Sequence, residues 1–124
     1  MSKQLRILII EDDFWLAEQF ERILAVHHYQ VQHVPHALAA IDVIDEFKPD
    51  AIVLDVLLTG TTAFTLLHEL QSYNDTAAIP VVLCTNMAAD LDGEQLVPYG
   101  VQRILDKSVM QPDDIVTALR SVTL

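Results

Sequence analysis

Four short apolar runs in this chain each stop at polar residues, and together they constrain the fold more than any other feature. The runs and the residues that follow them are LRILII before Glu11, Asp12 and Asp13; AIVL before Asp55; VVLC before Thr85; and VQRIL before Asp106 and Lys107. Runs without polar alternation are typical of strands that are buried on both faces of a parallel sheet. Because the carboxyl ends of parallel strands meet at one edge, we expect these polar side chains to lie together there.

Strand-like and helix-like segments alternate along the whole chain, which predicts an α/β fold. The predicted strands are 5–10, 30–34, 51–54, 80–84 and 101–105. We expect them to form a doubly wound, five-stranded parallel sheet of flavodoxin-like order 2-1-3-4-5, in which right-handed crossovers place helices on both faces. With no linker-like stretch or repeat, we expect one domain over residues 1–124.

Apolar residues at helical spacing mark the helices between these strands. The expected buried stripes are Leu16, Phe20, Ile23 and Leu24; Leu38, Ile41 and Ile44; Phe64, Leu67 and Leu70; and Ile115, Leu119 and Val122. The segment 87–98 is the weakest of the helical patterns, because its apolar stripe is thin, Gly93 lies inside it and Pro98 limits its end. We expect this segment to be the easiest in the domain to shift.

Composition narrows the classes of function. The 124 residues, 52% of them hydrophobic, suffice for one core, and a net charge of −11 disfavours direct binding to nucleic acid or to an anionic membrane. The single cysteine, Cys84, excludes an internal disulfide and is expected to be a buried thiol in a reducing compartment. No stretch resembles a signal peptide or a membrane span, so the expected location is the cytoplasm.

The predicted cluster of acids has a definite chemistry. Each pair of carboxylates 4 Å apart would repel by about 4 kcal/mol at an effective dielectric of 20, so the cluster needs a counter-charge. Hard oxygen ligands in an open site favour Mg²⁺, and Lys107 would add a second positive charge near Asp55. A carboxylate in such a site can accept a phosphoryl group, and the Thr85 hydroxyl could hydrogen-bond one of its oxygens. Taken singly, each of these residues would be interpreted as a surface or turn residue; the ordered combination favours a phosphoacceptor site.

With these residues identified, the chain resembles, over essentially its whole length, the receiver domain of two-component response regulators. ILIIEDD is similar to that family's acidic turn, VLDVLL to its phosphoacceptor strand, CTN to its Ser/Thr position and LDK to its lysine strand. The resemblance implies that Asp55 is phosphorylated, that Thr85 and Lys107 contact the phosphoryl group, and that Mg²⁺ is held by Glu11, Asp12, Asp55 and the backbone carbonyl of Leu57. Asp13 matches a further acidic position of the family.

The resemblance also implies partners. A sensor histidine kinase or a histidine phosphotransfer protein would donate the phosphoryl group, and a downstream effector or an output domain outside this chain would read the change. The family's usual surface for a homodimer falls within 87–122. The chain would be a regulator that assists its own phosphorylation and dephosphorylation, rather than a turnover enzyme.

Several residues depart from the family's pattern. Thr59 and Ala63 stand where receivers usually have Pro and Gly, Asn86 stands where they have Ala, and Ser108 replaces the Pro after the lysine. If that peptide were cis, a non-proline residue there would cost about 2.5–4 kcal/mol. Ile104 occupies the position of an aromatic residue that rotates inward on phosphorylation, so we expect coupling through repacking of 87–98 against Ile104.

Two other functions compete with the phosphoacceptor. The departures favour a receiver-like interaction module that is never phosphorylated. The presence of all five core site residues favours phosphorylation instead; these are Glu11, Asp12, Asp55, Thr85 and Lys107. A small phosphatase of the haloacid dehalogenase type would use Asp55, but such enzymes carry Asp-x-Asp, and residue 57 is Leu. The five histidines show no metal-binding spacing and are interpreted as surface residues.

Overall fold

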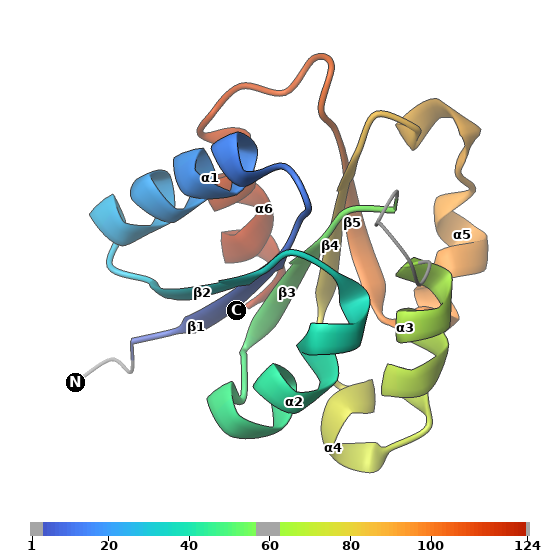
Figure 1. The fold of residues 1–124 in the computed structure, drawn as a ribbon. Helices are drawn as coiled ribbons and strands as arrows, with labels where there is room; N and C mark the ends of the chain where they lie inside the picture. Colours follow the sequence, from blue (N-terminus) through green and yellow to red (C-terminus); the bar gives the residue numbers. More distant parts are fainter. Residues whose placement is uncertain (1–3, 57–62, 124) are drawn as a thin grey trace.

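The computed structural model describes residues 4–56 and 63–123 and contains one five-stranded sheet (Figure 1). Its strands are β1 (Arg6–Ile10), β2 (Gln30–Val34), β3 (Ala51–Leu54), β4 (Val81–Thr85) and β5 (Val101–Asp106). All neighbouring strands are parallel, and their order is β2-β1-β3-β4-β5. The predicted fold class is therefore confirmed, with strand ends within one residue of the prediction.

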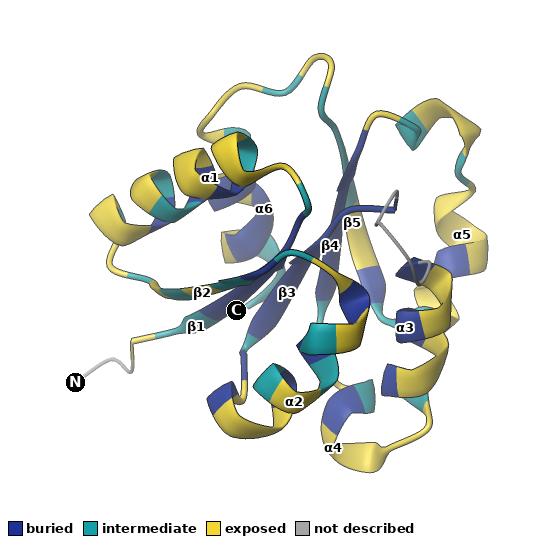
Figure 2. Cartoon of the chain, in the orientation of Figure 1, coloured by how far each residue is buried: buried dark blue, intermediate teal, exposed yellow. Residues whose placement is uncertain are grey.

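Helices cover both faces of the sheet and divide the core into two clusters (Figures 1 and 2). α1 (Phe14–Val26) and α6 (Asp114–Val122) pack on one face, whereas α2 (Ala37–Phe47), α3 (Ala63–Gln71) and α5 (Gly93–Leu96) contribute to the other. The short α4 (Asn74–Ala77), absent from the sequence prediction, follows α3. β1, β3 and β4 are almost entirely buried between the two layers, as their unbroken apolar sequences predict.

The buried stripes of two helices differ from the prediction. Leu38 is 77% exposed and Phe64 is 40% exposed, although both were expected in the core. In both helices the stripe begins one residue earlier, at Ala37 in α2 and at Ala63 in α3. Small alanines at these positions let the helices approach the sheet closely, which a count of large apolar residues alone does not reveal.

The segment predicted as the weakest helix is divided into three short pieces. η1 (Ala88–Asp90) and η2 (Val97–Tyr99) are 3₁₀ turns, and α5 lies between them as a single helical turn. Asp92 caps α5 by accepting a hydrogen bond from the backbone N–H of Glu94 at 3.0 Å. Gly100 then ends η2 with a φ of +85°, a conformation that favours glycine.

Two further expectations can be compared with the structure. Cys84 is buried as predicted, and burial raises the pKa of its thiol to about 12, which keeps it protonated and unreactive at neutral pH. Within the described part of the chain, every helix is too short or too polar to span a membrane.

Candidate functional site

The strand order places the acidic residues side by side. Glu11 directly follows β1, and Asp55 directly follows β3, the neighbouring strand. The backbone N–H of Asp55 donates to the carbonyl of Ile10 at 3.1 Å, and that of Glu11 donates to the carbonyl of Val34 at 3.1 Å. These bonds extend the sheet ladders by one residue, so the site is built on rigid backbone at the carboxyl edge of the sheet.

Three of the predicted acids form a cluster. Oxygen atoms of Glu11, Asp12 and Asp55 all lie within 4.8 Å of one another. Glu11 and Asp55 are buried, with 2% and 6% of their surface exposed, and Asp12 is the most exposed of the three. The geometry thus brings together the three carboxylates that sequence analysis assigned to a metal site.

Asp13, the fourth acid of the turn, has a different environment. Its Oδ1 accepts hydrogen bonds from the backbone N–H groups of Trp15 at 3.0 Å and Leu16 at 3.2 Å. This is the arrangement of a helix N-cap, which satisfies two of the N–H groups left unpaired at the start of α1. The backbone N–H of Asp13 in turn donates to Oε2 of Glu11 at 3.2 Å.

Lys107 supplies the positive charge of the cluster. Its Nζ lies 2.5 Å from Oε1 of Glu11 and 3.0 Å from Oδ2 of Asp55. The backbone N–H of Lys107 donates to the carbonyl of Thr85 at 3.0 Å, which extends the β4–β5 pairing to the site. One ammonium group therefore bridges carboxylates that follow two different strands.

Burial and charge alter the protonation of this cluster. Burial raises the pKa of Glu11 to about 7, against the opposing effect of its hydrogen bond with Lys107, and the nearby charge of Asp55 raises it further. Burial disfavours the charged form of Lys107, but its hydrogen bonds to Glu11 and Asp55 outweigh that effect and raise its pKa. Lys107 therefore stays charged, whereas Glu11 can take up a proton near neutral pH when only Lys107 balances the acids.

Thr85 lies at the end of β4 and is fully buried. Its Oγ1 accepts a hydrogen bond from the backbone N–H of Met87 at 3.0 Å. Because a hydroxyl can accept and donate at once, the hydrogen of Thr85 remains available to another acceptor. This hydrogen bond ties the end of β4 to the start of the segment that contains η1 and α5.

The loop after Lys107 is held by its neighbours rather than by a cis peptide. No cis bond occurs among residues 4–56 and 63–123, so the peptide between Lys107 and Ser108 is trans. Oδ1 of Asp106 accepts from the backbone N–H of Ser108 at 2.9 Å and from its hydroxyl at 2.6 Å. These bonds lower the pKa of Asp106. Ser108 thus stabilises a local turn in which the strain of a non-proline cis bond is absent.

Two of the departures from the family's pattern lie directly after β4 and within β5. Asn86 is exposed, and Ile104 is half-buried against the core cluster of α2 and α3. A hollow of about 590 Å³ beside Ile104 is lined also by Gly93 and Val97. Leu57, whose carbonyl was expected to bind the metal, and Thr59 lie outside the described residues.

His33 was interpreted as a surface residue, and that interpretation is wrong. Its side chain is only 12% exposed, and its Nε2 lies 2.7 Å from the carbonyl oxygen of Glu11. The strand period contained a usable indication, because His33 shares a face of β2 with Val31. Val31 packs in the core cluster that includes α1, so the side chain of His33 also lies on the face of the sheet that α1 covers.

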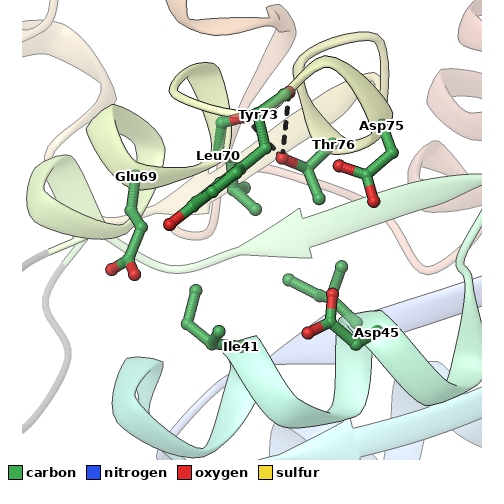
Figure 3. Close-up of a pocket in the computed structure, with 8 residues that line it drawn as sticks. Ile41, Asp45, Glu69, Leu70, Tyr73, Asp75 and Thr76 are labelled. Carbon is green, nitrogen blue, oxygen red and sulfur yellow. Dashed lines mark hydrogen bonds between the residues drawn. The ribbon is translucent and has the colours of Figure 1, made fainter.

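A separate pocket lies away from this site. It encloses about 350 Å³ between α2 and the α3–α4 region, and Figure 3 shows its lining residues. The buried hydroxyl of Thr76 donates to the carbonyl of Leu70 at 2.5 Å and fixes the wall of the pocket. The residues that line this pocket do not include Glu11, Asp12, Asp55, Thr85 or Lys107. The pocket is therefore separate from the candidate site.

The fold and the site agree with the comparisons with known proteins. Residues 7–120 match the response regulator receiver domain family. Over 80 residues, or 64% of the chain, the sequence is 31% identical to response regulator MprA of Mycobacterium sp. strain KMS. A receiver domain assigned to the Luxo repressor protein of Vibrio parahaemolyticus superposes with a TM-score of 0.86 at 25% identity, covering 98% of this chain and 91% of that one.

A third relative is known in an activated form. The BeF3-activated N-terminal receiver domain of RstA from Klebsiella pneumoniae gives a TM-score of 0.82 at 26% identity and covers 95% of this chain and 97% of that one. The chain belongs to the response regulator receiver domain family, and that membership implies a phosphoacceptor role in two-component signalling. Its aligned segment spans only 34% of MprA, so the relatives contain parts that this chain does not match.

Proposed function

We propose that this chain, as one receiver domain over residues 1–124, is a Mg²⁺-dependent phosphoacceptor that takes a phosphoryl group on Asp55. The observation that supports this most is the position of Lys107, whose Nζ contacts both Glu11 and Asp55 while Asp12 completes the acidic cluster. Asp55 is buried, follows β3, the middle strand of the sheet, and touches the ammonium group, and its choice over Glu11 comes from the resemblance of VLDVLL to the family's phosphoacceptor strand. It combines a fixed position with a local charge balance that suits phosphoryl transfer.

The donor set fits Mg²⁺. Glu11, Asp12 and Asp55 offer hard carboxylate oxygens within 4.8 Å of one another, and the resemblance adds the carbonyl of Leu57. A bound divalent cation would supply charge neutralisation for the phosphoryl oxygens. The excess negative charge of three acids against one ammonium group gives the site its affinity for such a cation.

The residues of the chain would then divide the chemistry. An oxygen of the Asp55 carboxylate attacks phosphorus while the bond from phosphorus to the donor breaks, and the bonding electron pair leaves with the donor. Lys107 would balance the negative charge beside Asp55, and the hydroxyl of Thr85 would donate to a phosphoryl oxygen while still accepting from Met87. No proton has to leave Asp55, because its carboxylate attacks in the ionised form.

The same proposal includes the partners and the location. A histidine kinase or a histidine phosphotransfer protein would be the donor, acting on this chain in the cytoplasm. The signal would pass to an effector protein or an output domain by contact, and self-association would use the 87–122 surface. The chain would act as a regulator whose own phosphorylation it assists, without turnover of other substrates.

Intact-protein mass spectrometry after incubation with acetyl phosphate and Mg²⁺ tests the proposal. A gain of about 80 Da is the mass expected for one phosphoryl group, and it should be lost in Asp55→Asn and without the metal. Asp42→Asn, which changes an exposed aspartate of α2 by the same chemistry, should keep the gain.

The outcomes separate the candidate functions. Loss of the gain in Asp55→Asn alone would support phosphorylation of Asp55. A gain that survives in Asp55→Asn would place the phosphoryl group elsewhere and refute the assignment. A folded wild-type protein that takes up neither phosphate from acetyl phosphate or a histidine kinase nor Mg²⁺ would favour the interaction module.

A further inference from the structure

Both main-chain polar groups of Glu11 are paired with the end of β2. Its N–H donates to the carbonyl of Val34 at 3.1 Å, and its carbonyl oxygen lies 2.7 Å from Nε2 of His33. A carbonyl oxygen only accepts hydrogen bonds, so Nε2 of His33 carries the hydrogen in this contact. The first acid of the turn is therefore held at two points by one edge strand.

The ring of His33 is itself held in place by α1. It packs edge-on against Phe14, with ring centroids 5.6 Å apart and an interplanar angle of 88°. Its other nitrogen, Nδ1, faces Glu21 of α1 at 4.0 Å from Oε1. The edge-on packing against Phe14 holds the ring between β2 and the start of α1, so that Nε2 stays directed at Glu11.

The position of this hydrogen bond matters because of peptide geometry. The carbonyl of Glu11 and the backbone nitrogen of Asp12 belong to one planar unit. A donor that fixes the carbonyl oxygen therefore fixes the orientation of the plane from which both side chains leave. Glu11 and Asp12 are two of the three carboxylates in the cluster.

We propose that His33 is a positioning residue for the metal site, acting through the carbonyl of Glu11 to hold the Glu11–Asp12 peptide in the orientation that groups their carboxylates with Asp55. This inference rests on the proposed function, because it assumes that the cluster binds a divalent cation. Outer-shell partners of this kind usually contribute about 10–100-fold to metal affinity or activity.

Two substitutions separate the hydrogen bond from the rest of the side chain. His33→Gln keeps an N–H donor at about the reach of Nε2, whereas the shorter side chain of His33→Asn does not extend to the carbonyl of Glu11. His33→Phe is a second donor-free variant that keeps a ring against Phe14. His36→Asn serves as the control, because His36 is exposed and makes no capping hydrogen bond at the start of α2.

The dissociation constant for Mg²⁺ is measured by calorimetry, with the melting temperature of each metal-free protein measured alongside. We expect His33→Asn and His33→Phe to raise the constant about tenfold, and His33→Gln to stay within about threefold of wild type. The rate of phosphate uptake from acetyl phosphate should follow the same order. His36→Asn should match wild type in the dissociation constant for Mg²⁺ and in the rate of phosphate uptake.

The readouts distinguish the positioning role from the proposed function. Wild-type protein that binds Mg²⁺ while both donor-free variants bind it equally well would overturn the role of His33 and leave the phosphoacceptor proposal intact. Equal weakening in His33→Gln and His33→Asn would also overturn it, because the donor would then be irrelevant. Wild-type protein that neither binds Mg²⁺ nor takes up phosphate would overturn both.

Discussion

Nζ of Lys107 lies 2.5 Å from Oε1 of Glu11, so the residue after the last strand of the chain is paired with the residue after the first. In the sheet, β3 and β4 lie between these two strands. The long lysine side chain reaches across them to the acidic turn, and it contacts Asp55 on the way. This contact therefore joins the segments that follow the first and the last strand at the site.

Replacing Lys107 by Met should destabilise the metal-free protein. The variant leaves two buried carboxylates without their counter-charge, and removing one partner of a fully buried pair costs about 3–5 kcal/mol. Because this site is open at one side, we expect a loss of about 2 kcal/mol in the free energy of unfolding. Mg²⁺ should stabilise the variant more than wild type, because a cation can replace the missing charge.

Urea titrations with EDTA and with Mg²⁺ measure both effects. Arg22→Met is a matched control, because the ion pair of Arg22 with Glu18 is largely exposed and should contribute less than about 1 kcal/mol. Equal losses in the two variants would contradict the prediction.

The pH dependence of stability should reveal the buried carboxyl of Glu11. Its pKa is raised from 4.5 to about 7 in the folded protein, so the folded state binds this proton more tightly than the unfolded state. The resulting stabilisation is complete below about pH 4.5 and is lost as the pH rises through about 7. In EDTA, the stability of wild type relative to Glu11→Gln should therefore fall across this interval, and parallel curves would refute the assignment.

Two glycines near β5 should respond oppositely to substitution by alanine. Gly100 has a φ of +85°, and a Cβ there would lie 3.2 Å from Nε2 of Gln71 and 3.3 Å from the carbonyl of Ile79. We expect Gly100→Ala to lose about 1–2 kcal/mol of unfolding free energy, the cost of a left-handed conformation. Thermal or urea unfolding measures this loss.

Gly93 is the matched control for this change. It begins α5, is exposed, and a Cβ there would meet only Cδ1 of Ile104 at an ordinary 3.8 Å. Gly93→Ala should leave stability unchanged or raise it by up to about 1 kcal/mol, because alanine restricts the unfolded chain. A larger loss at Gly93 than at Gly100 would contradict both assignments.

Activation of the site should change the environment of Ile104, although this residue is not aromatic. The hydroxyl oxygen of Thr85 accepts a hydrogen bond from the backbone N–H of Met87. A movement of this hydroxyl toward a phosphoryl group would therefore disturb the segment 87–98, which lies beside Ile104. We expect the Cδ1 methyl resonance of Ile104 to shift when beryllofluoride and Mg²⁺ are added. The methyl of Ile23, which packs in the opposite core cluster, is the internal reference. A response confined to the Asp55 loop would exclude this coupling.

Most of the fold was predictable because its pattern is repeated. Each strand is a short apolar run, the expected order was the flavodoxin-like one, and right-handed crossovers then place helices on both faces of the sheet. The carboxyl edge of the sheet then had to contain Glu11, Asp12 and Asp55, and the structure places their oxygens together. Their roles in binding metal and phosphate remain predictions.

The parts that sequence could not give depend on contacts between distant segments. The start of the buried stripe of α2 was wrong by one residue, because Ala37 and not Leu38 is buried, whereas Ile44 is buried as predicted. The strand period predicts the face of β2 on which His33 lies, but the fit of its ring between Phe14 and the carbonyl of Glu11 depends on contacts between distant segments. The turn at Ser108 depends on a side-chain hydrogen bond from Ser108 to Asp106 that substitutes locally for the family's proline.

The division of residues 88–99 into η1, α5 and η2 has a consequence for the dynamics of this surface. Pieces of three or four residues contain few helical hydrogen bonds, so they open locally at a lower free energy than the buried strands beside them. Their amide hydrogens should exchange with solvent well before those of β4. A protein that docks here would meet a segment that it can reshape, and part of its binding energy would be used to order that segment.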